Sequence, residues 1–258
     1  MDLQIYLAVT PGEYQEAAKY NRAFAHVAYR IGPGSTLLRQ NLLLQTKGGL
    51  LSISDREAPE ISDAQALCAA VLRECGRRGY TGALLDFERP AREDRVLFAQ
   101  QLGRLLSTSR RTLYVPESYA HAVTTSIPLI CTALSGGSFT ERLRDAAALR
   151  GSAAKLALDV QRLRMDFRLP ARTGEGTPLS AEELHRLMER ESPAVFFSQE
   201  LCARYFTYSR GGDTHFVLFD DADTLNQKLK VGASLGFSAA FLMWPEIRDL
   251  AGTLNLSR

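Results

Sequence analysis

The sequence predicts an α/β protein that folds as a single (β/α)8 TIM barrel, with a β-hairpin inserted between the last two barrel strands. Eight apolar runs rich in β-formers recur along the 258 residues, and helical patterns lie between several of them. Alternating strands and helices require parallel pairing through right-handed crossovers, and about 250 residues is the usual size of a closed eight-stranded barrel. An open doubly wound sheet is the alternative architecture.

The strands and helices are marked by short local signals. The expected strands are Leu3–Val9, Phe24–Tyr29, Leu50–Ser54, Gly82–Phe87, Thr112–Val115, Leu129–Leu134, Lys155–Val160 and Ala239–Trp244. Ser62 opens one helix and Gly79 closes it, and Ser138–Glu141 and Ser180–Glu183 read as capping boxes. Asp221 or Asp223 opens the last long helix, which ends at Gly236.

One domain is expected over residues 1–258, with the insertion at about 171–219. Within Ala194–Asp220, the runs YFTY and THFVLF flank a Ser-Arg-Gly-Gly-Asp turn, the pattern of a β-hairpin. We find no repeat with a period of 20–50 residues and no low-complexity segment.

Composition and charge exclude several classes of protein. Hydrophobic residues make up 45% and charged residues 23% of the chain, as in ordinary globular proteins, and the net charge is only +2. We therefore expect no nucleic-acid partner and no membrane insertion. The N-terminus lacks a secretory signal pattern, so we expect a cytoplasmic location, with a spore-associated one as the alternative. The oligomeric state is not predicted.

No cofactor and no metal are expected. The four histidines share no ligand spacing such as HxxxH, and the four cysteines form no CxxC pair, which favours buried thiols. The glycine pairs do not form a phosphate-binding motif.

The chemistry is expected in the segment TGALLDFER, residues 81–89. Because side chains alternate along a strand, Asp86 and Glu88 share one face with Leu84, while Leu85 and Phe87 share the other. If the second set packs under helices, both acids point into the barrel, at roughly 7 Å Cα spacing, at the strand end where barrel active sites lie. Such a pair suits general acid catalysis. The alternative is that Glu88 only caps the next helix or pairs with a nearby arginine.

Several stretches resemble known glycosidases. TGALLDFE is similar to the fourth-strand signature of glycoside hydrolase family 18, in which an Asp-Gly pair leads to Asp-x-Asp-x-Glu. FAHVAYRIGPGSTL, KLALDVQRLRMDFRLP, ARYFTY and FDDADTLNQKLKVGASLGFSAAFLMW resemble stretches of the spore-cortex-lytic N-acetylglucosaminidase branch. The resemblance thus extends over nearly the whole chain.

The resemblance implies hydrolysis of a β-linked N-acetylglucosamine glycan, such as peptidoglycan, spore cortex or chitin, by a substrate-assisted retaining mechanism. Glu88 corresponds to the family's acid/base and Asp86 to the residue that holds the acetamido N–H. Trp244 corresponds to the aromatic floor under the sugar; the alternative for this sole Trp is a place in the core. Tyr29, Tyr114 and Glu117 are candidates, on position alone, to orient the acetamido group.

The sequence also departs from the family's pattern. Thr81 and Leu84 stand where the signature has its first two acids, and Ala133 and Leu134 stand where the sixth strand has Tyr-Asp. These departures leave a second hypothesis open, namely a catalytically inactive glycan-binding or scaffold barrel.

Overall fold

The computed structural model describes residues 3–20, 22–40, 47–171, 175–254 and 256, and its main sheet is a closed barrel of eight parallel strands. These strands are β1 (Gln4–Val9), β2 (Ala23–Gly32), β4 (Leu50–Ser54), β5 (Gly82–Asp86), β6 (Thr112–Pro116), β7 (Ile127–Cys131), β8 (Ala157–Val160) and β14 (Ala239–Met243). Pairing between β1 and β2 closes the barrel, and β3 (Thr36–Arg39) adds an antiparallel strand to β2. The expected eight-stranded barrel is confirmed, and the open-sheet alternative is excluded.

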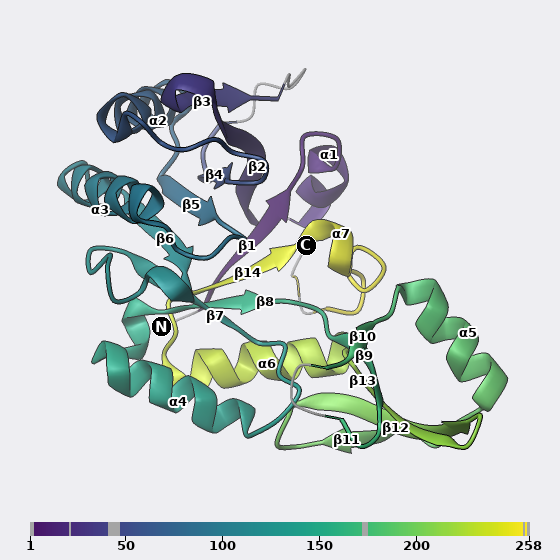
Figure 1. Cartoon of the computed structure of the whole chain (residues 1–258). Helices are drawn as coiled ribbons and strands as arrows, with labels where there is room; N and C mark the ends of the chain where they lie inside the picture. The colour runs from purple at the N-terminus through teal and green to yellow at the C-terminus, as the bar shows by residue number, and fades with distance from the viewer. Residues whose placement is uncertain (1–2, 21, 41–46, 172–174, 255, 257–258) are drawn as a thin grey trace.

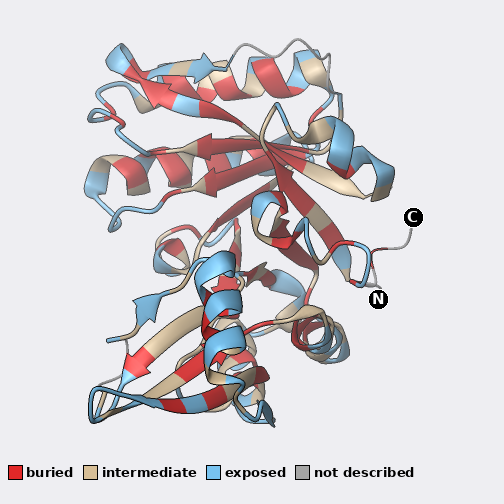
Figure 2. Cartoon of the chain, turned by 90° about the vertical axis from the view of Figure 1, so that its right-hand side faces the viewer, coloured by how far each residue is buried: buried red, intermediate tan, exposed pale blue. Residues whose placement is uncertain are grey.

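Helices cover the outside of the barrel (Figure 1). They are α2 (Ala64–Arg78), α3 (Glu93–Thr108), α4 (Phe139–Arg150) and α6 (Ala222–Leu235), with two single-turn helices, α1 (Tyr14–Ala17) and α7 (Trp244–Ile247). Apolar side chains on the strands' outer faces pack beneath these helices, so buried residues follow the strands and the inner helix faces (Figure 2).

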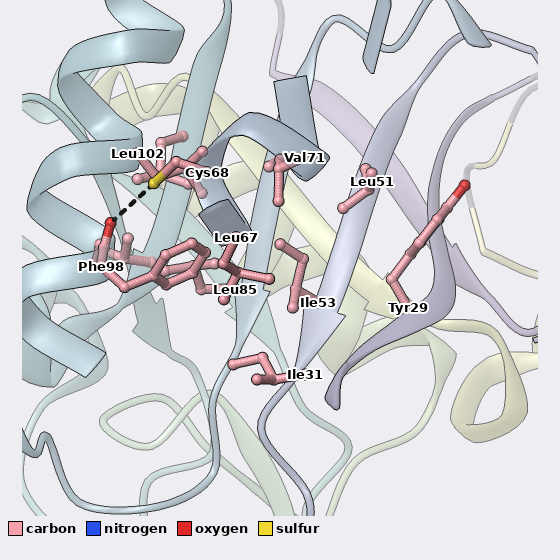
Figure 3. Packing of buried hydrophobic residues seen from close by; sticks show 14 of the residues in the cluster. Tyr29, Ile31, Leu51, Ile53, Leu67, Cys68, Val71, Leu85, Phe98 and Leu102 are labelled. Atoms are coloured by element: carbon pink, nitrogen blue, oxygen red, sulfur yellow. Dashed lines mark hydrogen bonds between the residues drawn. The ribbon is translucent and has the colours of Figure 1, made fainter. Parts of the chain in front are cut away.

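The cluster beneath α2 and α3 shows how the outer layer is built (Figure 3). Leu85 of β5 and its outer-face neighbours on β4 meet apolar residues of both helices. Cys68 of α2 also places its thiol 3.9 Å from the carbonyl oxygen of Phe98 on α3. A smaller cluster fills the inside of the barrel, where Phe241 stacks on Tyr6 at 5.0 Å between ring centroids.

Most helix ends lie where the sequence predicts them. Gly79 ends α2 in the left-handed conformation, with φ at 67°, although Asp63 rather than Ser62 caps its first turn. Both hydrogen bonds of the Ser180–Glu183 capping box form at the start of α5 (Ala181–Glu191). Asp221 caps α6 in the same way, since its carboxylate accepts the Thr224 amide.

The inserted hairpin is part of a second, antiparallel sheet between β8 and α6. It consists of β12 (Ala203–Arg210) and β13 (Asp213–Phe219), and the full strand order is β10-β9-β13-β12-β11. The added strands are β9 (Arg164–Arg168), β10 (Thr177–Pro178) and β11 (Phe196–Ser198). Helix α5 packs on one face of this sheet, which lies beside the barrel (Figure 1). The second sheet therefore begins at Arg164, before the expected start of the insertion.

Candidate functional site

Strand β5 presents Asp86 at the C-terminal end of the barrel. Leu84 packs into the inner cluster, whereas Leu85 and Phe87 pack in the outer layer beneath the helices. Asp86 is the last residue of β5 and follows the inner set, so its carboxyl group lies at the barrel mouth. The strand alternation expected from the sequence is therefore confirmed.

Burial and neighbouring acids together change the acidity of Asp86. Its pKa rises from the usual 3.8 to about 6, mainly because burial removes water from the carboxylate. The charges of Glu88, Asp159 and Asp55 raise this pKa further, in that order of size. Asp86 therefore binds and releases its proton near neutral pH, within a group of four acids.

Glu88 lies two residues beyond β5 and is exposed to solvent. Its backbone amide donates a hydrogen bond to Oδ1 of Asp55 over 3.0 Å. Between the two candidate acids, Phe87 turns outward and its ring packs near those of Phe98 and Tyr119, at 6.5 and 5.9 Å between centroids. The charge of Glu88 is near enough to raise the pKa of Asp86, while the Glu88 side chain itself is exposed to solvent.

Asp159 is a third acid at the mouth that sequence reasoning missed. It lies on β8, where Ala157 packs in the inner cluster and Leu158 and Val160 pack in the outer one, so alternation points Asp159 inward. Burial raises the pKa of Asp159, while a hydrogen bond of 2.7 Å from the Gln161 amide opposes that rise. The sequence did carry a signal for this site, because Asp159 is a charged residue within the otherwise apolar run ALDV.

Tyr114 lies inside the barrel, one layer below Asp86. It pairs in register with Leu84, its side chain is 5% exposed, and its ring meets Phe241 at 4.8 Å between centroids. Burial raises the pKa of its hydroxyl, which shares a hydrogen bond with Tyr6. Tyr114 therefore contributes to the floor of the mouth, with its hydroxyl already paired.

Tyr29 lies on the outside of the barrel, in the hydrophobic cluster beneath α2 (Figure 3). Its hydroxyl donates to Glu74 of α2 over 2.8 Å and lies 3.0 Å from the Tyr80 hydroxyl. Simple alternation from Ala25 and Val27 would turn Tyr29 inward. A bulge between Val27 and Tyr29 shifts the register, so that Tyr29 pairs with an outward residue of β4 and faces α2.

Glu117 and Trp244 are both held by other partners. Glu117 follows β6 and forms an ion pair with Arg142 of α4. Trp244 begins α7 and is 1% exposed, and its indole N–H donates to Glu16 over 3.3 Å. Because Met243 takes the inner position at the end of β14, Trp244 turns outward and has no open ring face for a sugar.

Features at other places do not add to this site. Among the described residues, no group of three or more His, Cys, Asp or Glu side chains is arranged to hold a metal ion. Within the same residues, no helix is both long and apolar enough to cross a bilayer. A hollow of about 490 Å³, lined in part by Thr124, Ser126, Arg150 and Lys155, lies at the opposite, N-terminal end of β7.

Solved glycosidase structures resemble this chain in three dimensions. A chitinase from Chromobacterium violaceum superposes with a TM-score of 0.69 at 18% identity, over 95% of both chains. The spore cortex-lytic enzyme SleL of Bacillus megaterium gives 0.66 at 15% identity, over 94% of this chain and 70% of its own. A GH18 chitinase from Cycas revoluta, crystallised with (GlcNAc)4, gives 0.66 at 14% identity, over 95% of this chain and 96% of its own.

The chain has a GH18-like fold. No model of a known protein family matches the sequence, and no curated protein matches it either. At these identities the likeness concerns the fold, and the fold alone does not determine the chemistry at the mouth.

Proposed function

We propose that the protein is a glycosidase that cleaves a β-linked, N-acetylglucosamine-containing glycan of the peptidoglycan, spore-cortex or chitin type. The observation that carries the proposal is the place of Asp86 at the C-terminal mouth of a GH18-like barrel, two residues before Glu88, where burial and neighbouring acids raise the pKa of Asp86 to about 6. Active sites of such barrels lie at this end, and paired carboxyl groups are the usual means of cleaving glycosidic bonds.

In the proposed mechanism, Glu88 donates its carboxyl proton to the glycosidic oxygen as the bond from that oxygen to the anomeric carbon breaks. The carbonyl oxygen of the substrate's own acetamido group attacks the anomeric carbon from the opposite face and forms an oxazolinium ion. Water then attacks the same carbon and opens this ring, while the Glu88 carboxylate takes a proton from the water. The second inversion restores the original anomeric configuration.

Asp86 is assigned to the acetamido group. As a carboxylate, it accepts a hydrogen bond from the acetamido N–H and offsets the positive charge of the oxazolinium ion. The charge of Asp159 lies close enough to affect Asp86 and adds negative potential at the same mouth. The ion would therefore form where negative charge is already in place, which lowers the barrier to its formation.

A second candidate function is glycan binding without hydrolysis. Leu84, which occupies the position of an inner acid in the family pattern, packs among apolar side chains beneath Asp86. The paired hydroxyl of Tyr114 and the covered ring of Trp244 also leave no additional group for the acetamido oxygen at those positions. This candidate retains a sugar-binding mouth and lacks turnover.

The test is incubation of the purified protein with peptidoglycan and with N-acetylglucosamine oligomers, followed by measurement of new reducing ends. Hydrolysis by the wild type supports the enzyme. Binding in calorimetry without new reducing ends favours the second candidate, and the absence of both contradicts the two proposals together.

A further inference from the structure

Asp55 is a buried carboxylate beside the proposed general acid. It follows β4 directly, is 0% exposed and accepts the Glu88 amide through Oδ1. Its other oxygen, Oδ2, has no hydrogen-bond partner among the described residues. Burying a carboxylate with so few partners costs several kcal/mol, and an apolar side chain of similar size is often the more stable choice. Stability alone therefore does not explain why a carboxylate is buried at this position.

The segment that carries Glu88 explains what Asp55 can do. Strand pairing ends at Asp86, where β5 meets Ser54 of β4, so Glu88 lies beyond the sheet. The ring of Phe87 is fixed by packing in the outer layer, and the next amide along the chain is fixed by Asp55. These two contacts hold the peptide group from which the Cα atom of Glu88 projects.

We propose that Asp55 is a positioning residue, whose carboxylate fixes the Glu88 backbone and thereby aims the Glu88 side chain at the glycosidic oxygen. The inference rests on the proposed function of Glu88 as general acid. Asp55 acts through the backbone and does not itself contact the substrate. Errors of about 1 Å in the placement of a catalytic group reduce rates by roughly 100-fold, so an anchor at this amide affects turnover.

The competing explanation is that Asp55 only braces a loop. Asp94 at the start of α3 provides the matched case, because its Oδ2 accepts the amide of Ile61 over 2.9 Å. Its side chain is also largely buried, at 10% exposed, yet the anchored amide is not that of an acid at the mouth. Asp94 also forms ion pairs with Arg92 and the buried Arg95, so Asp94→Ala removes an amide anchor together with more bracing than Asp55→Ala does, which makes it a stringent control.

Leaving groups of different acidity separate positioning from bracing. A sugar hydroxyl leaves only when it is protonated, whereas a dinitrophenolate leaves without a proton, so cleavage of the glycosidic bond depends on the aim of Glu88 for the first substrate only. The comparison is made on kcat/KM, which reports this cleavage and not the later attack of water, where Glu88 acts as the base for both substrates. We would measure hydrolysis of the N-acetylglucosamine tetramer and of dinitrophenyl diacetylchitobioside by the wild type, Asp55→Ala, Asp55→Asn, Glu88→Gln and Asp94→Ala. Asp55→Val, which refills the volume, replaces the Ala variant if that variant does not fold.

Asp55→Ala is expected to lose roughly 10- to 100-fold on the tetramer and less than about 3-fold on the dinitrophenyl substrate, the same selectivity as Glu88→Gln. Asp55→Asn retains an acceptor oxygen and should stay within about 3-fold of the wild type on both. Faster hydrogen exchange of the Glu88 amide in Asp55→Ala, and not in Asp94→Ala, would support the anchor independently of activity.

Each contrary result has its own meaning. Equal losses on both substrates, or the same selectivity in Asp94→Ala, would overturn the positioning role while leaving the glycosidase proposal intact. A wild type that hydrolyses neither substrate, nor peptidoglycan, would remove the proposed function and the role of Asp55 with it.

Discussion

Replacing Asp86 by Asn should make the protein more stable at neutral pH, although it removes a proposed catalytic group. The folded protein raises the pKa of this carboxyl from 3.8 to about 6, mainly through burial. That difference corresponds to about 3 kcal/mol. Because the folded state binds the proton more tightly than the unfolded state, the associated stability is present below pH 4 and is lost as pH rises through 6.

The side-chain amide in Asp86→Asn does not titrate, so the variant does not lose this stability as pH rises. Urea unfolding at pH 4 to 8 should show the variant's free energy of unfolding rising relative to that of the wild type by roughly 2–3 kcal/mol across the range. Asp145→Asn, at an exposed position on α4, is the control. If the difference between Asp86→Asn and the wild type stays within about 0.5 kcal/mol at every pH, the carboxyl group is not held as described.

Three further substitutions test separate parts of the structure. Asp159→Asn removes a charge that raises the pKa of Asp86, so the acid limb of the kcat/KM profile should move to lower pH; an unchanged limb would contradict the coupling. Tyr29→Phe removes a buried hydrogen bond to Glu74 and should lower the free energy of unfolding by about 1–2 kcal/mol without altering hydrolysis, whereas lost activity would place Tyr29 in the site. Lys228→Met leaves the charge of the fully buried Asp220 without its ion-pair partner, which lies 2.7 Å away in the wild type. The free energy of unfolding, measured in urea, should fall by about 3–5 kcal/mol; a variant as stable as the wild type would argue against that pair.

The fold could be predicted from the sequence because the spacing of apolar residues and the capping and turn residues indicate the same strands and helices along the chain. All eight expected strands form, and the β5 alternation correctly separates Asp86 from Phe87. The inserted hairpin is confirmed as well. β9 was missed because RMDFR follows an apolar strand with no turn signal strong enough to separate the two.

The positions of individual site residues depend on details that period does not encode. Tyr29 turns outward because one bulge changes the register of β2. Trp244, by contrast, faces outward by the ordinary alternation of β14, since Met243 takes the inner position. Asp159 lies on β8, far from β5 in sequence, and the closed barrel brings its charge to Asp86, whereas Asp55 follows β4, which pairs with β5 directly. Such contacts across the barrel require the strand order and register, which local patterns leave undetermined.

The anomeric configuration of the first product tests the proposed mechanism most directly. Proton NMR would follow the wild type on the N-acetylglucosamine tetramer within the first minutes, before the product equilibrates, with Glu88→Gln as the matched inactive control. We predict that the β-anomer appears first and that the Gln variant is slower by roughly 10²- to 10⁴-fold. Initial release of the α-anomer, or equal rates for the two proteins, would contradict retaining catalysis by Glu88.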